Sequence, residues 1–551
     1  MAVAVVGFLA IIVALAYFLL VVKSDKIPAF GGTYVEGVVT DSTGAVAFNP
    51  LLASVMPGTI SQDVSSLVFS GLTRADSAGA IKPDLADHWE TVEGPDKGRV
   101  WEFHLRQDVR WQDGYPITAR DVIFTLALLK DPDFPGSTPL ANLWRDVTVD
   151  RLGDYTVRFR LAAAWTPFLN YTTFGLLPEH LLKDKVTAKT LANSTFNLHP
   201  VGSGPYQMAQ DEPGRNGIML VQNSFYYGDK AYLAKVWFRP YPSSNAALSA
   251  LQANEIDGVS YVNPNQLNRV QADSHLEALN APFTQNNFLF LNLQRPAIFG
   301  NVDVRRALAY AIDRKAMVQQ LYGAQAHVSD SPILPISWAY KRDIRVYDYN
   351  LELANSTLDT AGWKLNPEGV REKNGSLLRF GLLVANDDNQ IAIGKQITDN
   401  LKAVGVLVEM QVAPTFQQFN DALTKHEYDG VLLGVQGVLN DPDVFQNWHS
   451  SEAGANGLNF ADWRNDAADQ LLEQARTTLD QEERRKTYDQ WQTMWANDLP
   501  SIPLFYSNYT YAISNRVGGV SRDSLKVMNT PSDRFKNLFQ RYVLTNTRFN
   551  T

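Results

Sequence analysis

A strand–helix–strand pattern between residues 377 and 412 limits the possible folds more than any other feature of the sequence. An apolar run of strand length covers 378–384, and apolar residues three or four positions apart follow it at 393–404. The run 406–412 then alternates apolar and polar residues, which is the period of a half-buried strand. Because a helical connection of this length joins parallel strands, the pattern predicts a parallel pair in a sheet covered by helices. The predicted fold class is therefore α/β.

Other segments extend this alternation of helices and strands. Residues 101–105 and 157–161 alternate as strands do, and an apolar strand at 428–435 follows a helix at 416–424. The remaining predicted helices are 118–130 capped by Thr118, 303–312 capped by Asp303, 465–478 and 481–497. Residues 26–32 contain Pro28, Gly31 and Gly32 and are interpreted as a short linker.

Length and composition restrict the classes of protein. A chain of 551 residues is too long for one core, so we expect two or three domains. The net charge is −9, and no run of Lys and Arg is longer than three residues, which argues against a nucleic-acid partner. The chain has no Cys, which excludes zinc fingers, iron–sulfur sites, thiol nucleophiles and a lipid anchor on Cys.

The N-terminal segment has the length and composition of a membrane span. Residues 2–22 carry no charged side chain and would span roughly 30 Å as a helix, the thickness of a bilayer core. We therefore expect one N-terminal transmembrane helix within 1–25 that remains uncleaved and tethers the protein. A cleaved signal peptide is the alternative.

No pattern of catalytic or metal-binding residues stands out. The eight His are never within four positions of one another, so no helical metal pair exists. Neither a G-x-S-x-G elbow nor a phosphate-binding G-x-x-x-x-G-K occurs. The sequence therefore predicts a protein that is not an enzyme, with no catalytic residues, no metal site and no cofactor.

Several motifs, in order along the chain, resemble the extracellular solute-binding proteins of family 5, which are the peptide-, oligopeptide- and nickel-binding subunits of ABC importers. The matching segments are Leu85–Glu90, Trp101–Arg106, Val109–Val122, Gly202–Tyr206, Val304–Arg314, Ala361–Trp363 and Leu499–Leu504. Val109–Val122 contains the D-G-x-P turn and T-A-x-D-V helix start of the family. The resemblance extends from about residue 31 to 515.

The resemblance implies a periplasmic-binding-protein-like, two-lobed fold with an additional β-rich domain. Lobe I would combine residues 30–75, 200–285 and 499–551, and the inserted second domain would be 76–199. Lobe III would be 286–498, with the ligand in a cleft between lobes I and III.

The function implied by the resemblance is that of the substrate-binding component of an ABC importer. It would capture a small solute, most often a peptide, outside the cytoplasm and deliver it to a permease with cytoplasmic ATPases. We expect a monomer, held at the membrane by the N-terminal helix. The alternatives are the same fold binding a sugar, an opine-like compound or a chelated metal, and a membrane-fixed solute sensor.

The resemblance also places the candidate ligand-binding residues, which fall in three regions. The first region precedes a helix in lobe I, and the alternative to ligand binding there is that Ser61 caps the helix. The second region lies where the chain crosses between the lobes, and its residues could pack the hinge rather than bind ligand. The third region follows a strand of lobe III. The candidates are Thr59, Ile60, Ser61, Gln62, Tyr261, Asn263, Asn286, Asn287, Gln436, Val438, Asn440 and Asp441.

Two positions depart from the pattern of peptide-binding members. Many of these members carry an Asp four residues before the Pro442 position, where it binds the ligand ammonium, and this chain has Val438 there. Where oligopeptide binders can carry Trp, this chain has Val435. A buried ammonium without a carboxylate partner is costly, so Asp441 or Asp443 would have to replace the missing Asp, unless both are turn residues.

Overall fold

The computed structural model describes residues 24–40, 45–56, 58–209, 216–437, 441–520 and 525–549. The predicted N-terminal transmembrane helix falls on residues outside these ranges, apart from its last two positions. Among the described residues, no helix combines the length and the apolar composition needed to cross a bilayer. The chain forms an α/β fold around one large mixed sheet.

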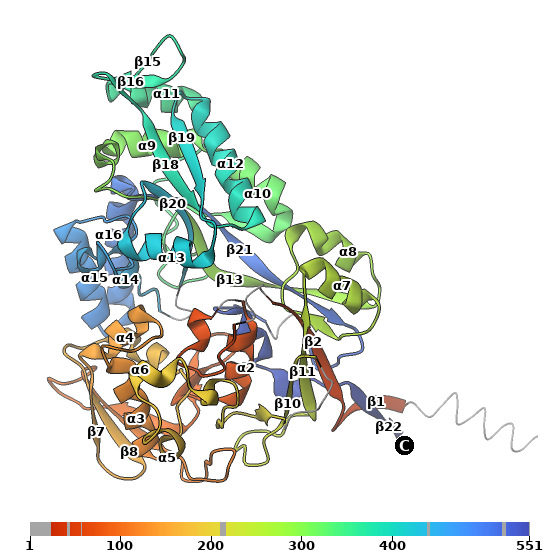
Figure 1. The fold of residues 1–551 in the computed structure, drawn as a ribbon. Coiled ribbons are helices and arrows are strands. Elements are labelled where there is room, and N and C mark those ends of the chain that lie inside the picture. Colours follow the sequence, from red (N-terminus) through yellow and green to blue (C-terminus); the bar gives the residue numbers. More distant parts are fainter. Residues whose placement is uncertain are drawn as a thin grey trace, which may run out of the picture.

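The large sheet has eleven strands and extends through most of the molecule (Figure 1). Its order is β19 (Leu407–Val412), β18 (Arg379–Val384), β20 (Gly430–Gln436), β13 (Leu276–Leu291), β21 (Ser501–Ser514), β12 (Gly258–Val259), β2 (Thr33–Val39), β11 (Lys235–Tyr241), β10 (Ile218–Gln222) and β9 (Tyr206–Met208), while β14 (Ala326–Val328) pairs with β21. Strands β18 and β19 are parallel, as the strand–helix–strand pattern predicts.

Helices cover the β18–β20 end of this sheet (Figure 1). They are α9 (Val302–Ala311), α10 (Arg314–Leu321), α11 (Leu351–Thr360), α12 (Asp388–Lys402), α13 (Phe416–Lys425), α14 (Phe445–Trp448), α15 (Asp466–Thr477) and α16 (Gln481–Asp498). The predicted helices are confirmed within one or two residues, except that α12 begins five residues before the first apolar position, 393, of its predicted pattern. The cap predicted at Asp303 is wrong, because the side chain of Asn301 accepts the hydrogen bond from the Asp303 amide.

The two longest strands, β13 and β21, connect separate hydrophobic cores. Leu279 and Ala281 of β13 belong to one core cluster, whereas residues from Phe288 onward belong to two others, whose buried members all lie between residues 288 and 505. Strand β21 changes core in the same place, between Phe505 and Tyr509. A register shift between Pro282 and Asn286 interrupts the pairing there. Such an irregularity bends a strand locally, and it lies where both strands pass from one core to the next.

A second, four-stranded antiparallel sheet lies below the first in Figure 1. Its order is β5 (Ala86–Thr91), β6 (Val100–Leu105), β8 (Thr156–Arg160) and β7 (Thr148–Arg151). Helix α3 (Ala119–Lys130) packs beside it, and Thr118 and Asp121 form a capping box at its start, as predicted. The other short elements here are β3 (Thr73–Ala75), β4 (Ile81–Pro83), α4 (Thr138–Arg145), α5 (Glu179–Leu182) and α6 (Ala188–Leu191).

The segments nearest the two termini pair with each other. Residues predicted as a linker form β1 (Ser24–Ala29), which is antiparallel to β22 (Leu544–Phe549), so the linker interpretation is wrong. That prediction used Pro and Gly as breakers, but an edge strand tolerates Pro28 because one side of its backbone needs no partner. Helices α7 (Ser244–Gln252) and α8 (Leu267–Gln271) cover the β2–β12 end of the large sheet.

A fully buried charge network holds the C-terminal segment against this end of the sheet. Arg534 donates to Glu36 of β2 at 2.9 Å and to both oxygens of Asp63 at 2.9 and 2.6 Å. Asp63 belongs to α2 (Ile60–Val68). Arg534, Glu36 and Asp63 have no exposed surface, so each charge depends on the others for compensation.

Candidate functional site

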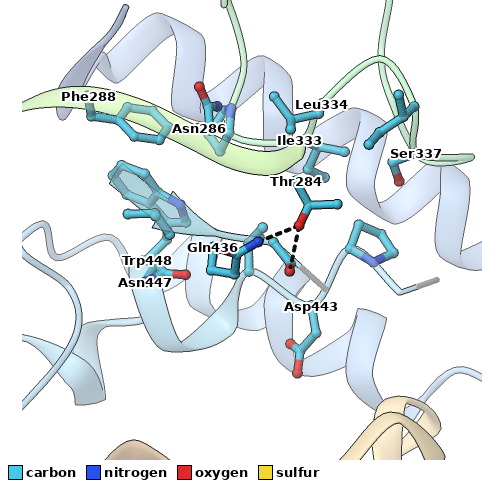
Figure 2. A pocket seen from close by; sticks show the side chains of 16 residues that line it. Thr284, Asn286, Phe288, Ile333, Leu334, Ser337, Gln436, Asp443, Asn447 and Trp448 are labelled. Carbon is cyan, nitrogen blue, oxygen red and sulfur yellow. Dashed lines mark hydrogen bonds between the residues drawn. The ribbon is translucent and has the colours of Figure 1, made fainter. Parts of the chain in front are cut away.

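A pocket with a volume of about 50 Å³ lies beside the crossing of β13 and β21 (Figure 2). It collects side chains from β13, from the loop 332–337, from the end of β20 and from the segment that continues into α14. The lining residues are Thr284, Asn286, Phe288, Pro332, Ile333, Leu334, Ile336, Ser337, Val435, Gln436, Gly437, Pro442, Asp443, Val444, Asn447 and Trp448. It therefore lies on the β20 side of the crossing, with Thr284 at the register shift itself.

Aromatic rings form the inner wall of the pocket. The ring of Phe288 meets the indole of Trp448 edge to face, with 5.6 Å between centroids. Trp448 in turn packs against Trp495 of α16 at 5.2 Å. Trp448 and Phe288 are each 1% exposed, so this wall is almost completely buried. It favours contact with an apolar group of a ligand.

Uncharged polar groups lie beside this wall. Gln436 donates from Nε2 to the hydroxyl of Thr284 at 2.5 Å, and this hydroxyl donates to Oδ1 of Asn529 at 2.7 Å (Figure 2 draws the first of these bonds). The amide of Thr284 also donates to the carbonyl of Met528 at 3.0 Å. Strand β13, strand β20 and the C-terminal segment are therefore joined at one hydroxyl.

Asn286 has an acceptor without a partner. Its Nδ2 donates to the carbonyl of Ser331 at 2.8 Å, which fixes the orientation of the amide. Its Oδ1 is buried and has no hydrogen-bond partner among the residues that the structure describes, and the whole residue is only 3% exposed. A buried acceptor left unpaired costs free energy, so this site favours a ligand that donates a hydrogen bond.

Two buried ion pairs follow β20. Asp441 accepts from both terminal nitrogens of Arg484 at 2.7 Å each, and burial raises its pKa while the guanidinium opposes that rise. Asp443 accepts from Nε and Nη2 of Arg476 at 2.8 Å each. The Asp443 and Asp441 side chains are 1% and 7% exposed. Both carboxylates are therefore neutralised by arginines of α15 and α16.

Arg476 also contacts the part of the chain that carries the four-stranded sheet. Its guanidinium lies 3.8 Å from the ring centroid of Phe445 and 5.7 Å from that of Trp165. The hydroxyl of Thr166 donates to the carbonyl of Thr478 at 2.9 Å. A second pocket, of about 170 Å³, lies here and is lined by Asn142, Leu143, Trp165, Gln446, Glu452 and Arg476.

The structure places some of the predicted site residues at the pocket. Asn286 and Gln436 line it, and Asp441 precedes two lining residues. Asn287 lies next to it on β13 and donates to the carbonyl of Phe505 at 3.2 Å. Val438 and Asn440 lie outside the described residues.

The other predicted residues do not line this pocket. Thr59 precedes α2, whose first three residues are Ile60, Ser61 and Gln62. Ser61 does not cap this helix: it is buried inside the first turn, where its hydroxyl accepts from the amide of Ala47 at 3.1 Å.

Two further predicted residues have structural contacts. The ring of Tyr261 lies 5.8 Å from that of Tyr509 of β21, which places it at the crossing. Asn263 takes part in a capping box and donates to the hydroxyl of Ser244 at 3.0 Å.

Sequence reasoning missed the residues that give the pocket its walls. Thr284, Ser337, Asn447 and Trp448 are far apart in sequence, and no motif joins them. Arg476 and Arg484 were assigned only to helices. One feature of the sequence could have indicated their role: each lies on a helix face that is otherwise apolar. An Arg at such a position can be buried when a carboxylate pairs with it.

One group of described side chains has the geometry to hold a metal ion. Ligand atoms of Glu90, Glu102 and His104 lie within 4.8 Å of one another on the outer face of the four-stranded sheet. Cross-strand pairing also stacks His88 on His104, with 4.2 Å between ring centroids. Arg158 already donates to Glu102 at 2.8 Å, so a metal would compete with an ion pair. This group belongs to another sheet than the pocket.

Comparison with known proteins agrees with the geometry. The model of the bacterial extracellular solute-binding proteins, family 5 middle region, matches residues 80–457. The oligopeptide-binding protein AppA of Bacillus subtilis is 28% identical over 512 residues, which cover 90% of each chain.

Solved structures are similar over almost the whole length. That of the oligopeptide-binding protein AppA from Bacillus subtilis in complex with a nonapeptide has a TM-score of 0.79 at 26% identity, covering 94% of this chain and 100% of its own. That of NikZ from Campylobacter jejuni in complex with Ni(L-His) has a TM-score of 0.78 at 27% identity, covering 93% and 99%.

Proposed function

The chain belongs to the bacterial extracellular solute-binding proteins of family 5, and from this premise we propose that it captures peptides for an ABC importer and delivers them to a membrane permease. The observation that carries the proposal is the pocket at the crossing of β13 and β21. The pocket opens next to this crossing, so closure around the crossing would bury a ligand bound there. The protein binds and releases its ligand without covalent chemistry.

The proposed architecture has two lobes and an inserted domain. Lobe I comprises residues 30–75, 200–285 and 499–551, and lobe III comprises 286–498. The change of core along β13 and β21 supports this division. The inserted domain, 76–199, shares its core cluster with lobe I, so we infer that these two parts move as one unit.

Within this architecture, Asn286 and Gln436 contact the ligand directly, since both line the pocket. The other candidates near the crossing are Asn287, Tyr261 and Asn263. They influence how the two lobes close around it. Thr59 and Gln62 contribute from the lobe I side of the cleft, and Val438 and Asn440 from the segment after β20. The buried Ile60, Ser61 and Asp441 act by positioning these segments.

We further propose that the protein works as a monomer outside the cytoplasm and is tethered by the apolar run 2–22. Strand β1 starts two residues after this run, which leaves almost no free chain between a membrane and the folded body. Mapping the N-terminus of the protein isolated from cell membranes tests the tether. A mature chain that starts beyond Val22 would rule it out.

A chelated metal is the second candidate ligand, and one observation favours it. NikZ, whose solved structure contains Ni(L-His), is as similar to this chain as the peptide-bound AppA structure is. The pocket described above offers no His, which favours the peptide.

Native mass spectrometry of protein purified without denaturation separates these candidates. We expect a heterogeneous set of bound masses that fragment as short peptides. A single bound mass that contains nickel or no amino acids would contradict the peptide proposal. Scattering with the released ligand added back then measures closure, and an unchanged radius of gyration would contradict the two-lobed mechanism.

A further inference from the structure

Resting on the proposed function, we propose that the pocket beside β13 receives an uncharged end of its ligand, namely an apolar group joined to an amide N–H, and excludes a free ammonium. The ligands are then peptides whose buried end is acylated.

The charge inventory of the pocket is the first argument. Of the sixteen described residues that line the pocket, Asp443 alone has an acidic or basic side chain. Arg476 occupies both of its oxygens, at 2.8 and 2.8 Å, and Figure 2 shows the carboxylate turned away from the hydroxyl of Thr284. The neighbouring Asp441 is likewise held by two nitrogens of Arg484. Neither acid is left to balance a ligand cation.

The cost of an unpaired charge is the second argument. The Phe288–Trp448 wall is almost completely buried, so an ammonium placed against it loses its water. A desolvated cation without a counter-ion is strongly disfavoured, whereas a neutral amide keeps its hydrogen bonds at a much smaller cost. Because none of the described lining residues is Lys, Arg or His, these residues offer a ligand carboxylate no partner either.

The unpartnered oxygen of Asn286 is the third argument. This acceptor is buried, and its amide is fixed by the bond to Ser331. A secondary amide N–H supplies the missing donor and carries no net charge. The apolar residues Ile333, Leu334 and Ile336 surround the remaining space, which suits the alkyl part of an acyl group.

Two matched peptide sets test the proposal. Both contain pentapeptides with Ala, Leu, Phe or Ser at each position; one set has free amino termini and the other is Nα-acetylated. Binding of each set to the full-length protein, stripped of ligand, is measured by competition and native mass spectrometry. We expect the acetylated set to bind about tenfold more tightly or better.

A charge inserted at Val435 makes the test specific to this pocket. Val435 lines it and is only half-buried, so polar substitutions are tolerated there. Val435→Asp supplies a carboxylate, whereas Val435→Asn has nearly the same shape without charge. We expect Val435→Asp to lower the preference for acetylated peptides by about tenfold or more, and Val435→Asn to retain it.

The outcomes separate the two proposals. If the free-amine set binds the unmodified protein equally well or more tightly, the proposal that the pocket receives an uncharged ligand end is wrong. The proposal that the protein captures peptides is then unaffected. An unchanged preference in a folded Val435→Asp variant also overturns the proposal of an uncharged end, because the recognised group then lies elsewhere. Binding of neither set overturns peptide capture itself, and the uncharged end with it.

Discussion

Arg484 and Asp441 form a bidentate ion pair inside the protein, with 2.7 Å in both nitrogen–oxygen contacts. The two side chains are 4% and 7% exposed. The pair joins α16 to the segment that follows β20 and so determines where the pocket-lining residues beyond it lie. It also occupies the carboxylate of Asp441, which the family resemblance gives as a candidate ligand contact.

Removing one partner of this pair should destabilise the protein strongly. Asp441→Asn leaves the Arg484 charge buried and unpaired, so we expect the free energy of unfolding to fall by about 3–5 kcal/mol, measured in urea. The control is Asp348→Asn at the exposed Lys315 pair, which should change nothing measurable. A loss below about 1 kcal/mol for Asp441→Asn would show that the pair is not needed.

The contact between Arg476 and Trp165 should hold α15 against the segment around Trp165. Trp165→Ala removes a cation–π contact worth about 0.5–1 kcal/mol, so amides in 476–479 should exchange hydrogen about two to five times faster. Trp237→Ala, a truncation of the same size on β11, serves as the control. Equal exchange in both variants would mean that the contact does not restrain the inserted domain.

Gly202 should tolerate no side chain. A Cβ at this position would lie 1.9 Å from the carbonyl oxygen of Val68, which is backbone and cannot move aside. Gly202→Ala should therefore cost at least about 2 kcal/mol in the free energy of unfolding. Gly153→Ala provides the comparison, because no atom lies within 4 Å of its added Cβ, and the two variants should differ clearly.

Asp84 should make stability depend on pH. Burial raises its pKa from 3.8 to about 6, although the hydroxyl of Tyr227 donates to it at 2.5 Å. An acid with a raised folded pKa stabilises the fold while protonated, so its contribution is present below pH 3.8 and is lost as the pH rises through 6. Between these limits the loss is on the order of 2–3 kcal/mol. Urea unfolding at several pH values should show a flatter profile for Asp84→Asn, and an identical profile would disprove the assignment.

Local patterns were sufficient to predict most of the elements. The parallel pair of β18 and β19, the capping box at Thr118 and the helices α15 and α16 all follow from periodicity and capping residues within one short window. The failures at Asp303 and Ser61 are single-residue errors in helix starts, where two or three nearby polar side chains compete for the same amides.

The site was less predictable, because its properties depend on residues that are distant in sequence. Gln436 and Asn286 could be placed from the resemblance, but the neutrality of the pocket could not. It depends on Arg476 and Arg484 reaching back 33 and 43 positions to Asp443 and Asp441. The helix pattern predicts the face on which such an arginine lies, but it does not predict which carboxylate the arginine binds.

The pairing of β13 with β21 has a consequence for biosynthesis. Phe290 pairs with Ser501 and Leu276 with Ser514, so the partners lie 211 and 238 positions apart in the chain. At about 5–20 residues per second, the ribosome needs on the order of ten seconds or more to supply the second strand after the first. Until then β13 has an open edge and the central sheet is incomplete. The central pairing of the large sheet can therefore form only after almost all of the chain has been made.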